Sequence, residues 1–172
     1  MPFTPYHMGP GILFKALLRG GFSLMIFGWV QILMDLQPLI VMVTNEGRLH
    51  GSSHTYLGAT LIAFFAAVSG KYLVQFVLGL LPQAKHRGVG ISWAVAFLSA
   101  FVGSYSHVAL DSIMHSDVVP FWPFSQANHL LGIVSASVLQ DVCVYSGLAG
   151  AALYFIVSYL LSRHNKRIER TA

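Results

Sequence analysis

Charged side chains are scarce in this chain of 172 residues, since Asp, Glu, Lys and Arg together make up only 9% of it. An average soluble protein has roughly 25%. Cysteine is scarcer still: Cys143 is the only one, which excludes an intramolecular disulfide and a thiolate metal cage. Hydrophobic residues account for 55% of the chain, and the mean hydropathy is +0.66. We therefore expect residues 1–172 to form a single integral membrane domain.

The chain also lacks the pattern of a secretory signal peptide. Residues 1–7 contain no basic segment followed by an apolar core and a cleavage site, so we expect the first helix to remain in the mature protein. The net charge is +4, but four of the ten Lys and Arg lie in the tail at 163–172. A basic tail of this kind suits anionic lipid headgroups at a cytoplasmic surface. A membrane lipid is therefore an expected partner, and nucleic acid is not.

Apolar segments of helical length predict an all-α, polytopic transmembrane bundle of about five helical segments. The expected segments are 9–19, 22–43, 56–81, 91–115 and 141–161. The first two should form a short hairpin that turns at Arg19, and the second should be interrupted at Asp35 and kinked by Pro38. Freed carbonyl groups and a carboxylate at a helix break often line a polar cavity.

The fourth segment ends in a stripe of ionisable side chains. His107, Asp111 and His115 are spaced by four residues, so a helix would place all three on one face. The apolar run that begins near Gly90 contains no charged residue before Asp111. Because an ionisable group inside a membrane is costly, it usually serves a function. Asp117 follows about half a turn after His115.

The distribution of Lys and Arg predicts the orientation in the membrane. The positive-inside rule places the Lys85 and Arg87 loop and the tail at 163–172 in the cytoplasm, and the connection at 117–140 on the opposite side. The helix order then brings further His and Asp residues to the same outer end, although none of them was used to set the orientation: His7, Asp35, His50 and His54. We therefore expect one polar site that opens to the extracytoplasmic side.

Imidazole and carboxylate groups without cysteine are typical ligands of Zn²⁺, Mn²⁺ or Fe²⁺ in hydrolytic sites that keep one position open for water. The sequence thus predicts a divalent metal, with zinc the first choice. Eight candidate residues are more than one tetrahedral ion needs. They suit either two ions, or one ion with surrounding groups that orient its ligands and accept a proton.

Four segments of the chain resemble the YdjM-type membrane-bound, metal-dependent hydrolases, a family of small inner-membrane proteins. They are Thr4 to His7, the Met34-Asp35-Leu36 segment, the His-Gly-x-x-His-Thr segment at 50–55, and the Ser-His-x-x-Leu-Asp segment at 106–111 that is followed by Pro120-Phe121. This resemblance implies a multi-pass protein of the bacterial cytoplasmic membrane that acts as a hydrolase.

The resemblance carries six residues over as metal or catalytic residues: His7, Asp35, His50, His54, His107 and Asp111. The helical spacing adds His115 and Asp117. We expect metal ligation by His7, Asp35, His54, His107, Asp111 and His115, and catalytic roles for Asp35, His50 and Asp117. Family members commonly have Asp-x-Asp in the second segment and an Arg in the third. This chain lacks that Arg and has Gln37 in place of the second Asp, which would weaken or remove one metal position.

These observations favour hydrolysis of a phosphoester or ester, with a small-molecule or lipid-linked substrate at the membrane surface. Two alternatives stay open. In the first, the same side chains carry a metal ion or protons through the membrane, which would require polar groups at both faces. In the second, the protein is a non-catalytic assembly subunit whose metal is structural. The oligomeric state does not follow from the sequence.

Overall fold

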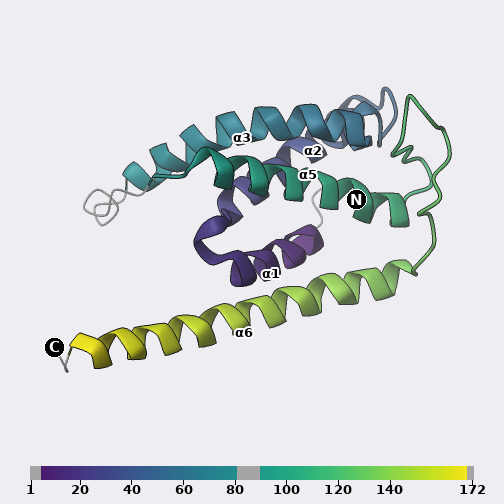
Figure 1. Ribbon diagram of the computed structural model, residues 1–172. Coiled ribbons are helices and arrows are strands. Elements are labelled where there is room, and N and C mark those ends of the chain that lie inside the picture. The colour runs from purple at the N-terminus through teal and green to yellow at the C-terminus, as the bar shows by residue number, and fades with distance from the viewer. Residues whose placement is uncertain (1–4, 81–89, 170–172) are drawn as a thin grey trace.

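The computed structural model describes residues 5–80 and 90–169 and contains five α-helices (Figure 1). They are α1 (Met8–Leu18), α2 (Leu24–Thr44), α3 (Tyr56–Gly79), α5 (Trp93–Met114) and α6 (Ala136–Glu169). Short 3-10 turns precede α1 (η1, Pro5–His7), join α1 to α2 (η2, Arg19–Gly21) and precede α3 (η3, Ser52–His54). Helices α2, α3, α5 and α6 are each long and apolar enough to cross a membrane. The prediction of an all-α, multi-pass membrane protein is confirmed.

Hydroxyl side chains begin three of the membrane-spanning helices. Ser23 accepts a hydrogen bond from the Ile26 amide at the start of α2, and Thr55 accepts one from Gly58 at the start of α3. Ser92 does the same for Val95 in α5. Each hydroxyl satisfies one of the backbone donors that a helix leaves free in its first turn. Since Thr55 directly follows His54, the cap of α3 also sets where that histidine lies.

The structure differs from the sequence prediction in the lengths of three helices. Helix α2 continues through Asp35 and Pro38 to Thr44, so the predicted interruption is wrong. Pro38 removes only one backbone hydrogen-bond donor, and the remaining hydrogen bonds keep the helix continuous. Helix α5 ends at Met114, and His115 has extended backbone angles, so His115 does not belong to the helical stripe. Helix α6 begins at Ala136, five residues before the predicted start.

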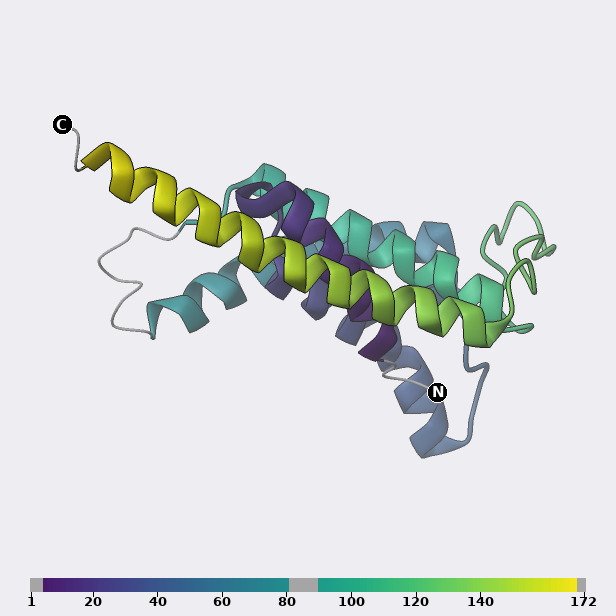
Figure 2. The ribbon, with the colours of Figure 1, turned by 90° about the horizontal axis from the view of Figure 1, so that it is seen from below.

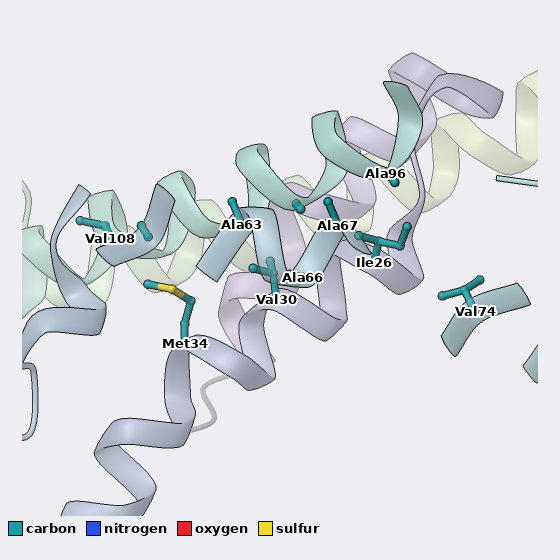
Figure 3. Close-up of a cluster of buried hydrophobic side chains, with 11 residues drawn as sticks. Ile26, Val30, Met34, Ala63, Ala66, Ala67, Val74, Ala96 and Val108 are labelled. Atoms are coloured by element: carbon teal, nitrogen blue, oxygen red, sulfur yellow. The ribbon is translucent and has the colours of Figure 1, made fainter. Parts of the chain in front are cut away.

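A small apolar core holds α2, α3 and α5 together. Figure 3 shows side chains of α2 directed toward alanines of α3. Because Ala63, Ala66 and Ala67 are fully buried and small, the helix backbones can approach closely, as is typical of membrane bundles. The other members of this core are Ile26, Val30, Met34, Ala59, Val74, Ala96, Ala100 and Val108.

Helix α1 packs between this core and α6, which runs along one side of the molecule (Figures 1 and 2). The α1–α6 contact is made through glycines. A Cβ atom at Gly9 would lie 1.9 Å from the carbonyl oxygen of Cys143, and one at Gly150 would lie 2.6 Å from the Cα of Leu13. Small residues at a helix crossing let the backbones touch. Because His7 directly precedes α1, this contact also determines where His7 lies.

The helix order creates two distinct ends. The site end, defined here by η1, the C-terminal half of α2, η3, the C-terminus of α5 and the N-terminus of α6, lies at the right in Figure 1. The opposite end holds η2, the N-terminus of α5 and the C-terminus of α6. The predicted loop at 82–90 with Lys85 and Arg87, and Thr4 of the family pattern, lie outside the described residues apart from Gly90. Membrane orientation therefore remains a prediction.

Candidate metal centre

All eight predicted site residues meet at the site end of the bundle. They come from five separate parts of the chain: η1, α2, the loop before η3 together with η3, α5, and the segment that follows α5. Between them they form overlapping groups of three whose ligand atoms lie within 4.8 Å of one another, which is close enough to hold a metal ion. The members are His7, Asp35, His50, His54, His107, Asp111, His115 and Asp117.

The carboxylate of Asp111 is the centre of this cluster. Its Oδ2 atom lies 3.2 Å from Nε2 of His54 and 3.2 Å from Nε2 of His107. Its Oδ1 atom lies 3.2 Å from Nε2 of His7. Nε2 of His115 lies 3.9 Å from Oδ1, and Nε2 of His50 lies 4.0 Å from Oδ2. Five imidazoles thus present the same ring nitrogen to one carboxylate.

Asp35 adds a second carboxylate from α2. Its Oδ1 atom lies 3.5 Å from Nε2 of His107, on the same nitrogen that faces Asp111. Asp35, His54, His107 and Asp111 are all buried, with His54 and His107 completely inaccessible to solvent. Buried ionisable groups at this density require compensating charge or hydrogen bonds.

The orientation of His107 is set by Gln31, one turn before Asp35 on α2. The amide nitrogen of Gln31 donates to the carbonyl oxygen of Gly103 at 3.1 Å, so its oxygen faces Nδ1 of His107 at 2.7 Å. Because that oxygen can only accept, Nδ1 of His107 carries the proton. In the neutral ring, the lone pair then belongs to Nε2, which faces the two carboxylates.

His50 and His54 are held in a similar way. Nδ1 of His50 lies 2.9 Å from both carboxylate oxygens of Asp117, and the His50 backbone amide also donates to Asp117. Nδ1 of His54 lies 2.9 Å from the hydroxyl of Ser53. Metal-binding histidines usually make such a hydrogen bond with one ring nitrogen, here Nδ1, so that the other, Nε2, is available to the metal.

The ring of His7 is buried against the centre of the cluster. It stacks on that of His107 at a centroid distance of 4.5 Å, and the residue is only 4% exposed. Within the described part of the chain, neither of its ring nitrogens makes a hydrogen bond of good geometry, although Nε2 lies 3.2 Å from Oδ1 of Asp111. A buried polar group in a native protein normally has a partner, and a cation beside Asp111 would supply one for Nε2.

The cluster becomes more accessible toward the segment that follows α5. The side chain of Asp111 is 5% exposed, that of His115 28% and that of Asp117 46%. Burial opposes the ionisation of Asp117, but its hydrogen bonds with His50 outweigh this effect and hold the pKa of Asp117 below its usual value. Burial lowers the pKa of His115 despite the nearby Asp111 carboxylate, which favours the neutral, metal-binding form of the imidazole.

A cavity of about 260 Å³ adjoins this accessible side. Arg48, His50 and Trp122 contribute to its walls, so it combines a cation, a cluster histidine and an aromatic ring. Water and polar ligands can therefore approach the cluster from the side of His50 and Asp117.

Sequence reasoning missed two residues that orient the cluster, Gln31 and Ser53, and it did not predict the structural role of Gln37. Gln31 is a buried amide four residues before Asp35, and that spacing in an apolar helix was the available signal. Ser53 directly precedes His54. Gln37, interpreted above as a weakened metal position, accepts a hydrogen bond from the Ser53 amide at 3.0 Å. It therefore ties α2 to η3, a role that is visible only after folding.

Replacing Gln31 by Leu should lower the metal affinity of the cluster by about 10- to 100-fold, because the His107 ring loses the partner that orients it. Competition with a chelator of known affinity measures the change. Gln75→Leu, which makes the same substitution in α3 away from the cluster, is the matched control and should bind metal as the wild type does. Equal affinities for the two variants would contradict the orienting role of Gln31.

Comparisons of the chain with protein-family models, with curated proteins and with solved structures find no match. The structure itself shows a multi-pass membrane helical protein with a buried cluster of His and Asp residues that could hold a metal ion.

Proposed function

We propose that this protein is a membrane-embedded, metal-dependent hydrolase of the YdjM type, located in the bacterial cytoplasmic membrane with its C-terminus in the cytoplasm. The observation that carries the proposal is the convergence of five Nε2 atoms on the Asp111 carboxylate. In His50 and His107 the proton on Nδ1 leaves a lone pair on Nε2, which faces a carboxylate, and Nε2 of His54 and Nε2 of His107 are themselves 3.2 Å apart. A lone pair and a carboxylate repel one another, and a divalent cation among them would turn that repulsion into attraction.

The spacing of the ligand atoms suits such an ion. Two ligand atoms bound at ~2.0–2.1 Å to one tetrahedral zinc lie about 3.3 Å from each other. Nε2 of His7, Nε2 of His54 and Nε2 of His107 each lie 3.2 Å from an oxygen of Asp111. The histidines divide between the two Asp111 oxygens, His7 and His115 toward Oδ1 and the others toward Oδ2, so Asp111 and these histidines would have enough ligand atoms to hold two ions.

The ion would lower the pKa of a bound water to near 7 and polarise a phosphoryl or carbonyl oxygen. The chain's own residues supply proton transfer. Nε2 of His50 lies 4.0 Å from Asp111, farther than the 3.2 Å of His7, His54 and His107. Its other ring nitrogen, Nδ1, is held by the Asp117 carboxylate. A general base and the group that positions it have this arrangement.

In the proposed reaction, water forms a new bond to phosphorus or to the acyl carbon while the ester bond to the leaving oxygen breaks. His50 accepts the proton of the water and returns it to the leaving oxygen, so no oxidant or further reactant is required. Asp35, whose Oδ1 atom lies 3.5 Å from Nε2 of His107, would serve as a ligand.

Metal content is the first experiment. Protein purified in mild detergent without chelator is analysed for bound metal by mass spectrometry, and it is then assayed on soluble phosphodiesters and carboxylic esters. Stoichiometric zinc or manganese with hydrolysis supports the proposal. Absence of metal, even after reconstitution, would overturn it. Metal binding without hydrolysis would favour the transporter or the structural subunit, which metal flux into vesicles then distinguishes.

Replacing Asp117 by Asn should lower kcat by about 10²-fold or more, the usual contribution of a positioned acid or base. The reason is that the amide no longer holds the His50 ring as a proton acceptor. Because Asp117 is not among the expected metal ligands, we expect the metal content to remain near that of the wild type. A variant that loses metal and activity together would assign Asp117 to ligation and would contradict its positioning role.

A further inference from the structure

A second, larger cavity meets the cluster at Asp35. Its volume is about 540 Å³, within the roughly 300–1,000 Å³ of small-molecule sites. It lies along one face of α2, between Met8 at the start of α1 and the second half of α3. The apolar part of its wall is formed by Met8, Met25, Gly28, Trp29, Ile32, Leu73, Val74 and Val77.

Apart from the indole N–H of Trp29, which donates to Ser69, the polar side chains of this cavity lie toward its site end. Gln31 and Asp35 line it there, and these are the two α2 residues that contact His107 in the cluster. The distance along α2 from Met25 to Asp35 is ten residues, roughly 15 Å at 1.5 Å per residue. The cavity is thus an elongated apolar groove that ends at a wall of the metal centre.

The groove is open to the surroundings of the bundle. Met25, Ile32 and Leu73 are exposed on its rim, although all three belong to helices that are candidate membrane spans. At that depth the surrounding medium is hydrocarbon rather than water. The natural occupant of an apolar groove open to hydrocarbon is a hydrocarbon chain, and it can enter sideways without crossing water.

The two cavities differ in character and share no lining residue. The groove reaches the cluster at Asp35 and is apolar, whereas the smaller cavity reaches it at His50 and contains Arg48. Each cavity therefore reaches one member of the cluster, and the pair suits a molecule with an apolar chain and an anionic head, the chain beside Asp35 and the head beside His50 and Arg48.

From this arrangement we propose that the substrate is a membrane lipid, with one hydrocarbon chain in the α1–α2–α3 groove and a phosphate-bearing head toward Arg48. This inference rests on the proposed hydrolase function and specifies its substrate class. The hydrolysed bond would be the ester or phosphoester at the junction of chain and head, and the chain-bearing product would remain in the groove until it diffuses into the bilayer.

Gly28 offers a way to fill the groove without disturbing the backbone. A Cβ atom at Gly28 would meet only the Met8 side chain, at 3.5 Å, so Gly28→Leu should place its side chain inside the groove. Gly79→Leu adds the same atoms at the end of α3, where a Cβ atom would meet nothing within 4 Å. Ile32→Trp narrows the groove from its rim and serves as a second blocking variant.

The test uses the full-length protein in phosphatidylcholine vesicles that contain a small fraction of phosphatidic acid with a diazirine near the end of one acyl chain. After illumination, peptide mass spectrometry locates the adducts. We expect adducts on the groove residues, their loss in Gly28→Leu or Ile32→Trp, and their retention in Gly79→Leu. Adducts spread evenly over the exposed faces of all spans, with no loss in either blocking variant, would overturn the inference.

Two further measurements separate this inference from the proposed function. Metal content shows whether a blocking variant has kept the cluster intact. Hydrolysis of a soluble short-chain phosphodiester should be unchanged in Gly28→Leu, whereas hydrolysis of a long-chain lipid should be lost. If soluble substrates are hydrolysed but the groove does not bind the probe, only the lipid inference fails. If the groove binds the probe but the protein holds no metal, the hydrolase proposal fails.

Discussion

Replacing Asp111 by Asn is expected to reduce the metal affinity at least about a hundredfold, equivalent to about 2.7 kcal/mol at 1.36 kcal/mol per factor of ten. The substitution preserves the shape of the side chain but removes the negative charge that all five histidines face. An amide also presents two N–H donors to ring nitrogens already surrounded by other donors and acceptors. A chelator competition titration and the metal-to-protein ratio after purification measure the loss.

Asp141→Asn is the matched control for this prediction. Asp141 is exposed on α6 and takes no part in the cluster, so this variant makes the same chemical change without touching the site. It should retain the wild-type metal content. If Asp111→Asn also retained it, Asp111 would not be the common ligand of the proposed metal site.

Replacing Gly9 by Leu is expected to lower the free energy of unfolding by about 3 kcal/mol, the upper range for overpacking a tight contact. Leu is a better helix former than Gly by about 1 kcal/mol, so helix propensity alone predicts the opposite sign. The steric term prevails because a Cβ atom at Gly9 would lie 1.9 Å from a backbone carbonyl of α6, and backbone has no alternative rotamer. Denaturation in mixed detergent micelles measures the change.

The same substitution should also weaken metal binding, because α1 carries His7 into the cluster and α6 holds α1 in place. Gly79→Leu is again the control and should leave both the stability and the metal content close to wild type. A Gly9→Leu protein as stable as the control would show that α1 and α6 do not pack as described.

Much of the candidate site could be predicted because its residues are recognisable in short stretches of sequence, and because placing their ionisable side chains in a membrane costs free energy. His107 and Asp111 stand four apart in an apolar helix, where an ionisable side chain is rarely tolerated without a purpose. Counting helices then placed His7, Asp35, His50 and His54 at the same end of the bundle. Such reasoning predicts which end a residue occupies, but it does not give the distance to its neighbours.

The misjudged features depended on local context that the pattern did not contain. Pro38 is a helix breaker by propensity, yet α2 passes through it because the rest of the helix is long enough to absorb one missing hydrogen bond. His115 was expected on the helix but follows its end. It still reaches Asp111 at 3.9 Å, since its backbone amide remains bonded to the Asp111 carbonyl oxygen.

The sequence by itself determined the membrane class, the helical architecture and the set of eight His and Asp residues, because hydropathy and helical spacing depend on neighbouring positions alone. Only the tertiary structure decided that Asp111 is the common centre, that Gln31 orients His107, and that an apolar groove ends at Asp35. These features join parts of the chain that lie far apart in sequence, such as His7 and Asp111. They follow from how closely the helices pack, which small residues such as Gly9 allow and local periodicity does not encode.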